Sequence, residues 1–256
     1  MNIQINPQYD DLSEFIACLP DIFPHYGEVV QKGRNTIKTF KVNGIVLNVK
    51  SFKVPIWINR IAYKYFRKSK AERSFIYAKR LLENGVNTPD PVAFVETSEK
   101  GLFACSYYVS IHETVDGTIR DIYTQPESES RSLVKAFTAF TARLHKKGVF
   151  HKDYSPGNIM YKKTDEGYEF YLVDLNRIEF KEIKIFDSCK SFRRIRMDED
   201  TIKTVANEYS GIRRYSKTLC EWLIGYYNRI FWKKYLNRHP EVLQTEFAHT
   251  IAVKQA

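Results

Sequence analysis

Long apolar runs are absent from this chain of 256 residues. No stretch approaches the roughly 18 uninterrupted apolar residues that a membrane-spanning helix needs. The N-terminal residues 1–16 include the acids Asp10, Asp11 and Glu14 and lack the basic segment of a secretory signal. We therefore expect a protein of the cytoplasm, without a membrane span or a cleaved leader.

Cysteine is scarce and scattered. The four cysteines are Cys18, Cys105, Cys189 and Cys220. No two of them form the Cys-x-x-Cys pattern that is typical of zinc and redox sites. We expect reduced thiols, most of them buried, and no chemistry carried by sulfur.

Acidic residues are outnumbered by basic ones. The chain has 40 Lys and Arg against 30 Asp and Glu, a net charge of +10, which favours an anionic partner. Residues 50–80 hold ten basic residues and one acid, and a second cluster comprises Lys190, Arg193, Arg194 and Arg196. Trp57 and other aromatics interleave with the first run, which favours a membrane surface over the alternative of a solvated face.

The first part of the chain is rich in short β-prone runs. Asn43-Gly44 separates two of them, which is the strongest short signal for a hairpin. Ser69-Lys70-Ala71-Glu72 then fits the start of a helix that Asn84-Gly85 ends. Two more strands follow, near residues 92–96 and 102–110. The pattern predicts a small antiparallel sheet with one helix over residues 1–111.

The second part of the chain is mainly helical. Leu133, Phe137, Phe140 and Leu144 recur at helical spacing and the run ends at Gly148. Two short strands follow, near residues 159–161 and 170–173, and residues 186–236 are helical in pattern. The fold class is therefore α+β, with a small N-terminal lobe (1–111) and a larger helical C-terminal lobe (112–256) in one two-lobed domain.

One polar segment between the helix and the strands carries the chemistry. It reads His151-Lys152-Asp153-Tyr154-Ser155-Pro156-Gly157-Asn158, and Asp174 follows the second strand. This is the layout of the catalytic loop and metal-binding loop of kinases. Phosphoryl transfer needs a carboxylate at the acceptor hydroxyl and oxygen ligands for Mg²⁺. We assign Asp153 as catalytic base, Asn158 and Asp174 as metal ligands, and His151 as a structural brace.

The nucleotide phosphates need a cation and a covering loop upstream. Lys50 ends an apolar strand and is the favoured lysine, with Lys53 as a near competitor. The covering loop should precede this strand, yet the chain has no G-x-G-x-x-G motif there. Residues 31–36 contain only Gly33, so backbone amides, Arg34 or Thr36 would have to act on the phosphates.

These motifs together resemble the lipopolysaccharide core kinases, the Kdo/heptose kinase family with a protein-kinase-like fold. The resemblance runs from about residue 33 to residue 236. The segments that carry it are residues 71–75 with 85–91, residues 144–153, Gly157-Asn158, and Val173-Asp174-Leu175-Asn176-Arg177. In the last segment, Leu175-Asn176-Arg177 replaces the Phe-Gly that follows the metal-binding aspartate in protein kinases.

The resemblance implies a function and a place. It implies phosphorylation by ATP, with Mg²⁺, of a Kdo or heptose hydroxyl in the inner core of a lipid A precursor. The work would take place at the cytoplasmic face of the inner membrane, on an anionic glycolipid, and no nucleic-acid partner is expected. The basic clusters and the aromatic residues 222–235 suit such a substrate, although a packed helix with a solvated basic face is the favoured reading of residues 222–235.

One position departs from the family pattern. The glutamate expected to pair with the strand lysine should directly precede the helix aromatic, and Ser74 stands there. Glu72 lies two residues earlier and is also the acid of the helix cap. Two roles therefore remain open for Glu72: it is either the partner of Lys50 or a capping residue of the helix.

Two other functions remain open from the sequence. The loop also resembles small-molecule kinases and atypical protein kinases, although the basic surface argues against a cationic substrate. A pseudokinase scaffold is the alternative from another class, favoured by the single-glycine loop and the displaced glutamate. The presence of Asp153, Asn158, Asp174 and Lys50 argues for an enzyme.

Overall fold

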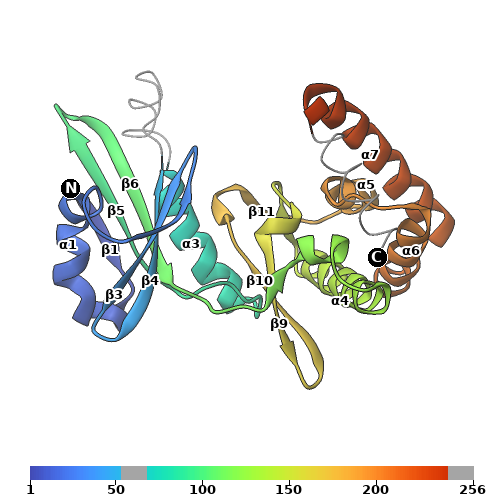
Figure 1. Cartoon of the computed structure of the whole chain (residues 1–256), viewed down its shortest axis with the longest axis horizontal. Coiled ribbons are helices and arrows are strands. Elements are labelled where there is room, and N and C mark those ends of the chain that lie inside the picture. Colours follow the sequence, from blue (N-terminus) through green and yellow to red (C-terminus); the bar gives the residue numbers. More distant parts are fainter. Residues whose placement is uncertain (53–67, 242–256) are drawn as a thin grey trace. The chain divides into compact units, whose positions relative to one another are not determined.

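The computed structural model describes residues 1–52 and 68–241. The chain divides into two compact units, each of which is described by itself: unit 1 comprises residues 1–116 and 171–178, and unit 2 comprises 117–170 and 179–256 (Figure 1). Trp57, Lys53 and the rest of the predicted basic and aromatic surface between 53 and 67 lie outside the described residues. Within the described ranges, no helix combines the length and apolar character that crossing a membrane requires.

Unit 1 is built on a six-stranded antiparallel sheet with the strand order β1-β5-β6-β4-β3-β2. Its strands are β1 (Asn2–Ile5), β2 (Glu28–Lys32), β3 (Thr36–Val42), β4 (Ile45–Phe52), β5 (Pro91–Glu99) and β6 (Leu102–Ile111). The predicted hairpin is confirmed, because Asn43 and Gly44 turn with φ of 49° and 80° and Val42 pairs with Ile45. Positive φ at both turn residues matches the twist of the strands they join.

The alternation of β4 places its residues on two different faces of the sheet. Leu47 and Val49 are fully buried in one hydrophobic cluster, which also takes in Ile16 and Leu19 of α1 (Ser13–Ile22). Phe52 belongs to a second cluster with Phe75 of α3 (Lys70–Glu83), and Lys50 lies two residues before Phe52 on the same strand. Lys50 therefore shares the α3 side of the sheet.

The N-terminal residues add elements that the sequence pattern did not predict. These are β1, the 3-10 helix η1 (Pro7–Leu12) and α1, which covers one face of the sheet. Pro20 lies inside α1, which obscures the helical pattern in the sequence. Unit 1 thus has two α-helices among its described residues, α1 and α3, where one helix was predicted.

Helix α3 begins and ends where the sequence indicated. The Ser69 side chain accepts a hydrogen bond from the Glu72 amide at 3.0 Å, so Ser69 is the N-cap. After Asn84, Gly85 adopts a φ of 61°, and the Val86 amide donates to the Leu81 carbonyl at 2.9 Å. This left-handed turn ends the helix in the usual way.

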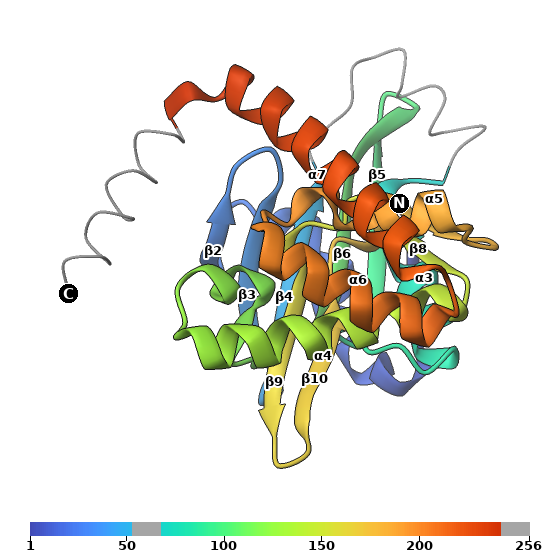
Figure 2. The ribbon, with the colours of Figure 1, turned by 90° about the vertical axis from the view of Figure 1, so that its right-hand side faces the viewer.

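Unit 2 is mainly helical, as predicted. Its helices are α4 (Glu127–Lys146), α5 (Ile185–Ser191), α6 (Glu199–Arg213) and α7 (Lys217–Arg238), with short 3-10 helices η2 (Ile119–Tyr123) and η5 (Phe192–Arg194). Helix α6 packs against both α4 and α7 (Figure 2). The core joins Phe137 of α4, Phe192 of η5 and Tyr209 of α6, whose rings meet edge to face at 5.3–6.0 Å.

Short strands complete the fold around the predicted catalytic segment. They are β7 (Gly117–Thr118), β8 (Val149–His151), β9 (Ile159–Thr164), β10 (Gly167–Leu172) and β11 (Ile178–Phe180). Strand β9 lies between β10 and β7, and β8 pairs with β11. Gly148, between α4 and β8, has a φ of 72°, and an added Cβ would lie 3.0 Å from the Lys181 carbonyl oxygen. A glycine is therefore needed where the helix enters the catalytic segment.

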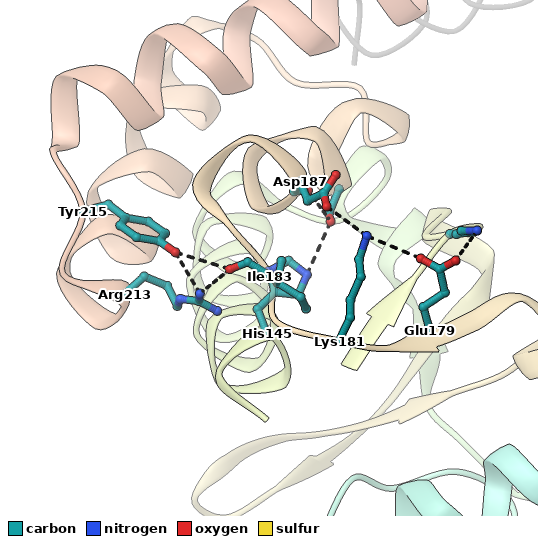
Figure 3. A network of polar contacts seen from close by, with 9 residues as sticks. His145, Glu179, Lys181, Ile183, Asp187, Arg213 and Tyr215 are labelled. Atoms are coloured by element: carbon teal, nitrogen blue, oxygen red, sulfur yellow. Dashed lines mark hydrogen bonds and ion pairs between the residues drawn. The ribbon is translucent and has the colours of Figure 1, made fainter. Parts of the chain in front are cut away.

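A polar network ties the end of α4 to the segment after β11 (Figure 3). His145 is buried and hydrogen-bonds with the Tyr209 hydroxyl through Nδ1 at 2.7 Å, and with the Ser191 hydroxyl through Nε2 at 3.4 Å. Nearby, Arg213 donates to the Ile183 carbonyl at 2.9 Å, and Lys181 pairs with Asp187 at 2.9 Å. The network holds the helices that support the catalytic segment.

Candidate active site

The segment between β8 and β9 is a fixed loop. His151 is 2% exposed, and its Nδ1 accepts a hydrogen bond from the Asp153 amide at 3.1 Å. The prediction that His151 braces the loop is confirmed. Tyr154 is buried below the loop, where its hydroxyl meets that of Thr141 at 2.8 Å, and burial raises the pKa of Tyr154. The loop is thus held from both sides of Asp153.

Asp153 presents a partly exposed carboxylate in unit 2. Its side chain is 24% exposed, and Oδ1 pairs with Nη1 of Arg194 at 2.5 Å. The side-chain amide of Asn158 donates to the Asp153 carbonyl at 2.8 Å. Nδ2 of Asn158 is used in this bond, and Oδ1 remains as an acceptor, which is the kind of atom that a hard cation requires.

Asp174 stands at the end of β10 in unit 1 and adopts a left-handed backbone, with φ 58° and ψ 52°. Such a conformation is uncommon outside glycine and concentrates at functional positions. The segment is anchored from behind, because Thr88 donates to the Leu172 carbonyl at 2.7 Å. The strained residue is therefore held by a fixed neighbour rather than by a mobile loop.

Lys50 meets Asp174 within unit 1. The Lys50 ammonium donates to Oδ1 of Asp174 at 2.7 Å, and the side chains are 17% and 28% exposed. Asn176 donates to the same oxygen at 2.7 Å. The structure thus pairs two residues that the sequence assigned separately, the phosphate-binding lysine and a metal ligand. The competing lysine, Lys53, lies outside the described residues.

A second lysine at this place was missed by the sequence reasoning. Lys70, the first residue of α3, lies over the Phe52 ring at 5.9 Å, and Lys50 lies over the same ring at 5.4 Å. Burial, followed by the charges of Arg34 and Arg73, lowers the pKa of Lys70, while the charge of Asp174 raises it. A cation crowded by other cations indicates a site for an anion. The signal in the sequence was the basic run itself, in which no single lysine stood out.

Within the described residues, neither Glu72 nor Gly33 forms a hydrogen bond or ion pair with Lys50. Glu72 pairs with Lys68 at 2.5 Å, and Lys50 forms its ion pair with Asp174, so no Lys50–Glu72 pair forms within the described part of the chain. Ser74, at the family's glutamate position, is buried and donates to the Lys70 carbonyl at 2.8 Å. An added Cβ at Gly33 would meet no atom within 4 Å. The roles of Glu72 and Gly33 in nucleotide binding stay predictions.

Each of the two predicted metal ligands, Asp174 in unit 1 and Asn158 in unit 2, has a side-chain oxygen that suits a magnesium ion. Among the described residues no group of three His, Cys, Asp or Glu side chains forms a self-sufficient metal cage. Mg²⁺ usually takes one or two protein ligands and completes its shell with substrate phosphates and water. Oδ2 of Asp174 and Oδ1 of Asn158 accept no hydrogen bond from the described residues, so each is an oxygen open to a cation.

Comparisons with known proteins give a match to a family model. The family model described as the lipopolysaccharide kinase (Kdo/WaaP) family matches residues 37–215, which include Lys50, Asp153, Asn158 and Asp174 but not Gly33. Among curated proteins, no sequence match was found.

Two solved structures are similar to the chain. WaaP in complex with acyl carrier protein has a TM-score of 0.62 at 16% identity, covering 91% of this chain and 99% of that chain. The PknI kinase domain of Mycobacterium tuberculosis has a TM-score of 0.40 at 12% identity, covering 75% and 74%. The likeness to the WaaP structure shows that the fold is the predicted two-lobed, protein-kinase-like α+β fold. Because the family model spans well over half of the sequence, this chain belongs to the lipopolysaccharide kinase (Kdo/WaaP) family.

Proposed function

We propose that this kinase transfers the γ-phosphoryl group of ATP to a hydroxyl of Kdo or heptose in the inner core of lipopolysaccharide. The observation that carries the proposal is the loop of unit 2, in which Asn158 is bound to the Asp153 carbonyl and the Asp153 carboxylate stands partly exposed. Membership of the lipopolysaccharide kinase family supports the class of acceptor.

Asp153 acts on the acceptor. Its carboxylate accepts the hydrogen bond of the sugar hydroxyl and takes up the proton as the oxygen attacks. A bond forms between that oxygen and the γ-phosphorus, the bond from the γ-phosphorus to the β–γ bridging oxygen breaks, and ADP leaves. The His151 ring fixes the Asp153 amide, so the base needs little rearrangement before the reaction.

Lys50 and Lys70 act on the nucleotide, with Arg34 as a third cation. The chain lacks a glycine-rich loop, and these cations supply positive charge for the phosphates within unit 1. Asp174 and Asn158 would hold Mg²⁺, which neutralises charge that develops on the phosphoryl oxygens when it is bound. The proposal includes Glu72 and Gly33 as further nucleotide contacts.

Place and partner follow from the substrate. We propose that the protein works on an anionic glycolipid at the cytoplasmic face of the inner membrane and binds that surface peripherally. Helix α7 supports this, because Leu219, Trp222, Tyr226 and Ile230 are exposed at helical spacing. Trp222 and Tyr226 stack at 5.3 Å with an interplanar angle of 9°. Arg229 and Lys233 lie on the same side by the 100° rotation per residue.

Labelled ATP tests the proposal through a panel of acceptors. Lipid A that carries Kdo, lipid A with a heptose-extended core, a generic protein and free sugars would be compared under the same conditions. We expect label in one of the two glycolipids only. Label in the protein alone contradicts the glycolipid assignment. Absence of transfer together with no thermal stabilisation by ATP and Mg²⁺ favours a scaffold, because a ligand that binds only the folded state raises stability.

A further inference from the structure

Asp153, the predicted catalytic base, forms an ion pair with Arg194. The phosphoryl transfer itself does not need an arginine at this position. Nη1 of Arg194 lies 2.5 Å from Oδ1 of Asp153, and the two side chains are 30% and 24% exposed. An ion pair open to water to this extent contributes little to folding stability. An arginine placed on a base that must be available to a hydroxyl calls for another explanation.

The backbone around Arg194 is fixed by neighbouring elements. Asn228 of α7 is 4% exposed, and its side-chain amide donates to the Ile195 carbonyl at 2.5 Å. The Arg196 amide donates to the Tyr123 hydroxyl at 2.8 Å. The guanidinium of Arg194 also lies over the Phe231 ring at 5.7 Å. The arginine is thus held in place without its contact to Asp153.

The hydrogen-bonding capacity of this guanidinium is largely unused. Nε of Arg194 is buried without a partner among the described residues, and Nη2 donates to none of them. Unlike Nε, Nη2 is not buried, so an incoming group can reach the outer edge of the fork. A guanidinium is the group that proteins favour for binding carboxylates and phosphates, and Nη2 is the donor that Arg194 has available for such a group.

The surroundings of the loop are also positive. The Arg120 guanidinium lies against the backbone of Gly157, where an added Cβ would come within 2.8 Å of Nη2. The acid Glu179 is paired with Lys152 of the loop and with Lys181. The loop that holds Asp153 therefore has a cation against its backbone at Gly157, and its neighbouring acid Glu179 is neutralised by lysines.

We infer that Arg194 binds an anionic group of the acceptor, a carboxylate or a phosphate, that lies beside the hydroxyl to be phosphorylated. This rests on the proposed sugar kinase activity and narrows its acceptor to a sugar that carries such a group. Without acceptor, Arg194 occupies Oδ1 of Asp153. When the anion binds the outer edge of the guanidinium, it brings the neighbouring hydroxyl to the carboxylate, so Arg194 acts as an acceptor-positioning residue.

The test combines a variant of the arginine with a change in the acceptor. Arg194→Gln and Arg194→Lys are measured with glycolipid acceptors that keep the carboxylate and phosphates, with the carboxylate methyl-esterified, or with the phosphates removed. We expect Arg194→Gln to lower kcat/KM for the intact acceptor at least about tenfold, with KM for ATP unchanged. Arg194→Lys restores part of the loss, because it keeps the charge but not the fork.

The modified acceptors identify the anion. For the acceptor that lacks the recognised group, wild type and Arg194→Gln react equally, and whether this is the ester or the dephosphorylated form tells carboxylate from phosphate. Arg131→Gln is the matched control, since Arg131 forms an exposed arginine–carboxylate pair with Glu127 on α4 at 2.8 Å. It leaves all rates unchanged.

Two results separate the failure of this inference from that of the proposed function. If wild type phosphorylates a glycolipid and Arg194→Gln matches it on every acceptor, Arg194 binds no acceptor anion and the inference is wrong. The inference also fails if Arg194→Gln loses the same factor on all acceptors, because the residue then serves only the loop. If wild type phosphorylates no glycolipid, it is the proposed function that fails.

Discussion

At the scale of single residues, the chemistry depends on a few charged side chains that hold one another in place. Lys50 and Asn176 both donate to Oδ1 of Asp174, and Asp153 forms an ion pair with Arg194. The sequence predicted Asp153, Asn158, Asp174 and Lys50 because each belongs to a motif with fixed spacing. Lys70 and Arg194 were not singled out, since their importance comes from neighbours that are distant in sequence. The left-handed backbone of Asp174 was not predicted either, because only a glycine would have indicated it in the sequence.

Replacing Lys50 tests the nucleotide side of the account. We expect Lys50→Ala to weaken ATP binding at least about tenfold, because a charged hydrogen bond to a phosphate oxygen is lost. Calorimetric titration with ATP and Mg²⁺ measures this. Lys41→Ala is the matched control, because Lys41 is an exposed lysine on the neighbouring strand β3. Equal affinity in the two variants would contradict the assignment of Lys50.

At the scale of elements, sequence patterns predicted what depends on local signals. The Asn43-Gly44 hairpin, the Ser69 cap of α3 and the stop at Gly148 each follow from one or two residues with a known conformational preference. The N-terminal β1 and α1 were missed, because β1 exists only through its pairing with β5 and α1 only through its packing on the sheet. Elements that depend on a distant partner leave a weak local pattern.

The buried His145 gives the helical unit a dependence on pH. Burial, and then the charge of Arg213, lowers the pKa of His145 from 6.5 to about 3. Between pH 6.5 and pH 3, His145 binds a proton in the unfolded chain but not in the folded chain. The stabilisation by neutral, buried His145 is therefore fully present above pH 6.5 and is lost as the pH falls. We expect the free energy of unfolding to fall by up to about 1.4 kcal/mol per pH unit from this group.

The variant His145→Gln isolates that contribution. It should lower stability at pH 7.5 by about 1–3 kcal/mol, because the buried contacts to Tyr209 and Ser191 are disturbed. It should also lose less stability than wild type between pH 6.5 and 4.5. Urea unfolding of both proteins across this range gives the comparison, and parallel curves would mean that His145 does not titrate as described.

At the scale of the whole molecule, the net charge of +10 and the exposed aromatic side of α7 both support the proposal that the protein binds an anionic lipid surface. Helix α7 begins after the last residue that the family model matches. Its outward residues are therefore a feature of this chain that the family match does not describe. The sequence alone favoured a packed helix over a lipid-binding one, because exposure depends on the fold.

Removing the exposed aromatics tests the membrane surface. We expect Trp222→Ser with Tyr226→Ser to lower binding to anionic vesicles at least about tenfold, because both rings lose apolar contact with lipid. Co-sedimentation with vesicles of phosphatidylglycerol measures this, and activity on a detergent-solubilised acceptor should persist. Tyr26→Ser is the control, since Tyr26 is 67% exposed in unit 1. Unchanged vesicle binding in the double variant would exclude α7 as the contact.

The central claim is that Asp153 is the base of a kinase acting on a core glycolipid, and phosphoryl transfer by Asp153→Asn tests it most directly. The variant keeps the size of the side chain and removes the carboxylate. Transfer of label from ATP to Kdo-bearing or heptose-bearing lipid A should fall at least about 100-fold. ATP binding should remain within about twofold of wild type, since Asp153 does not contact the nucleotide in this account. Asp165→Asn, an exposed aspartate in the turn between β9 and β10, should leave transfer unchanged. Transfer to the glycolipid that persists in Asp153→Asn would contradict the account.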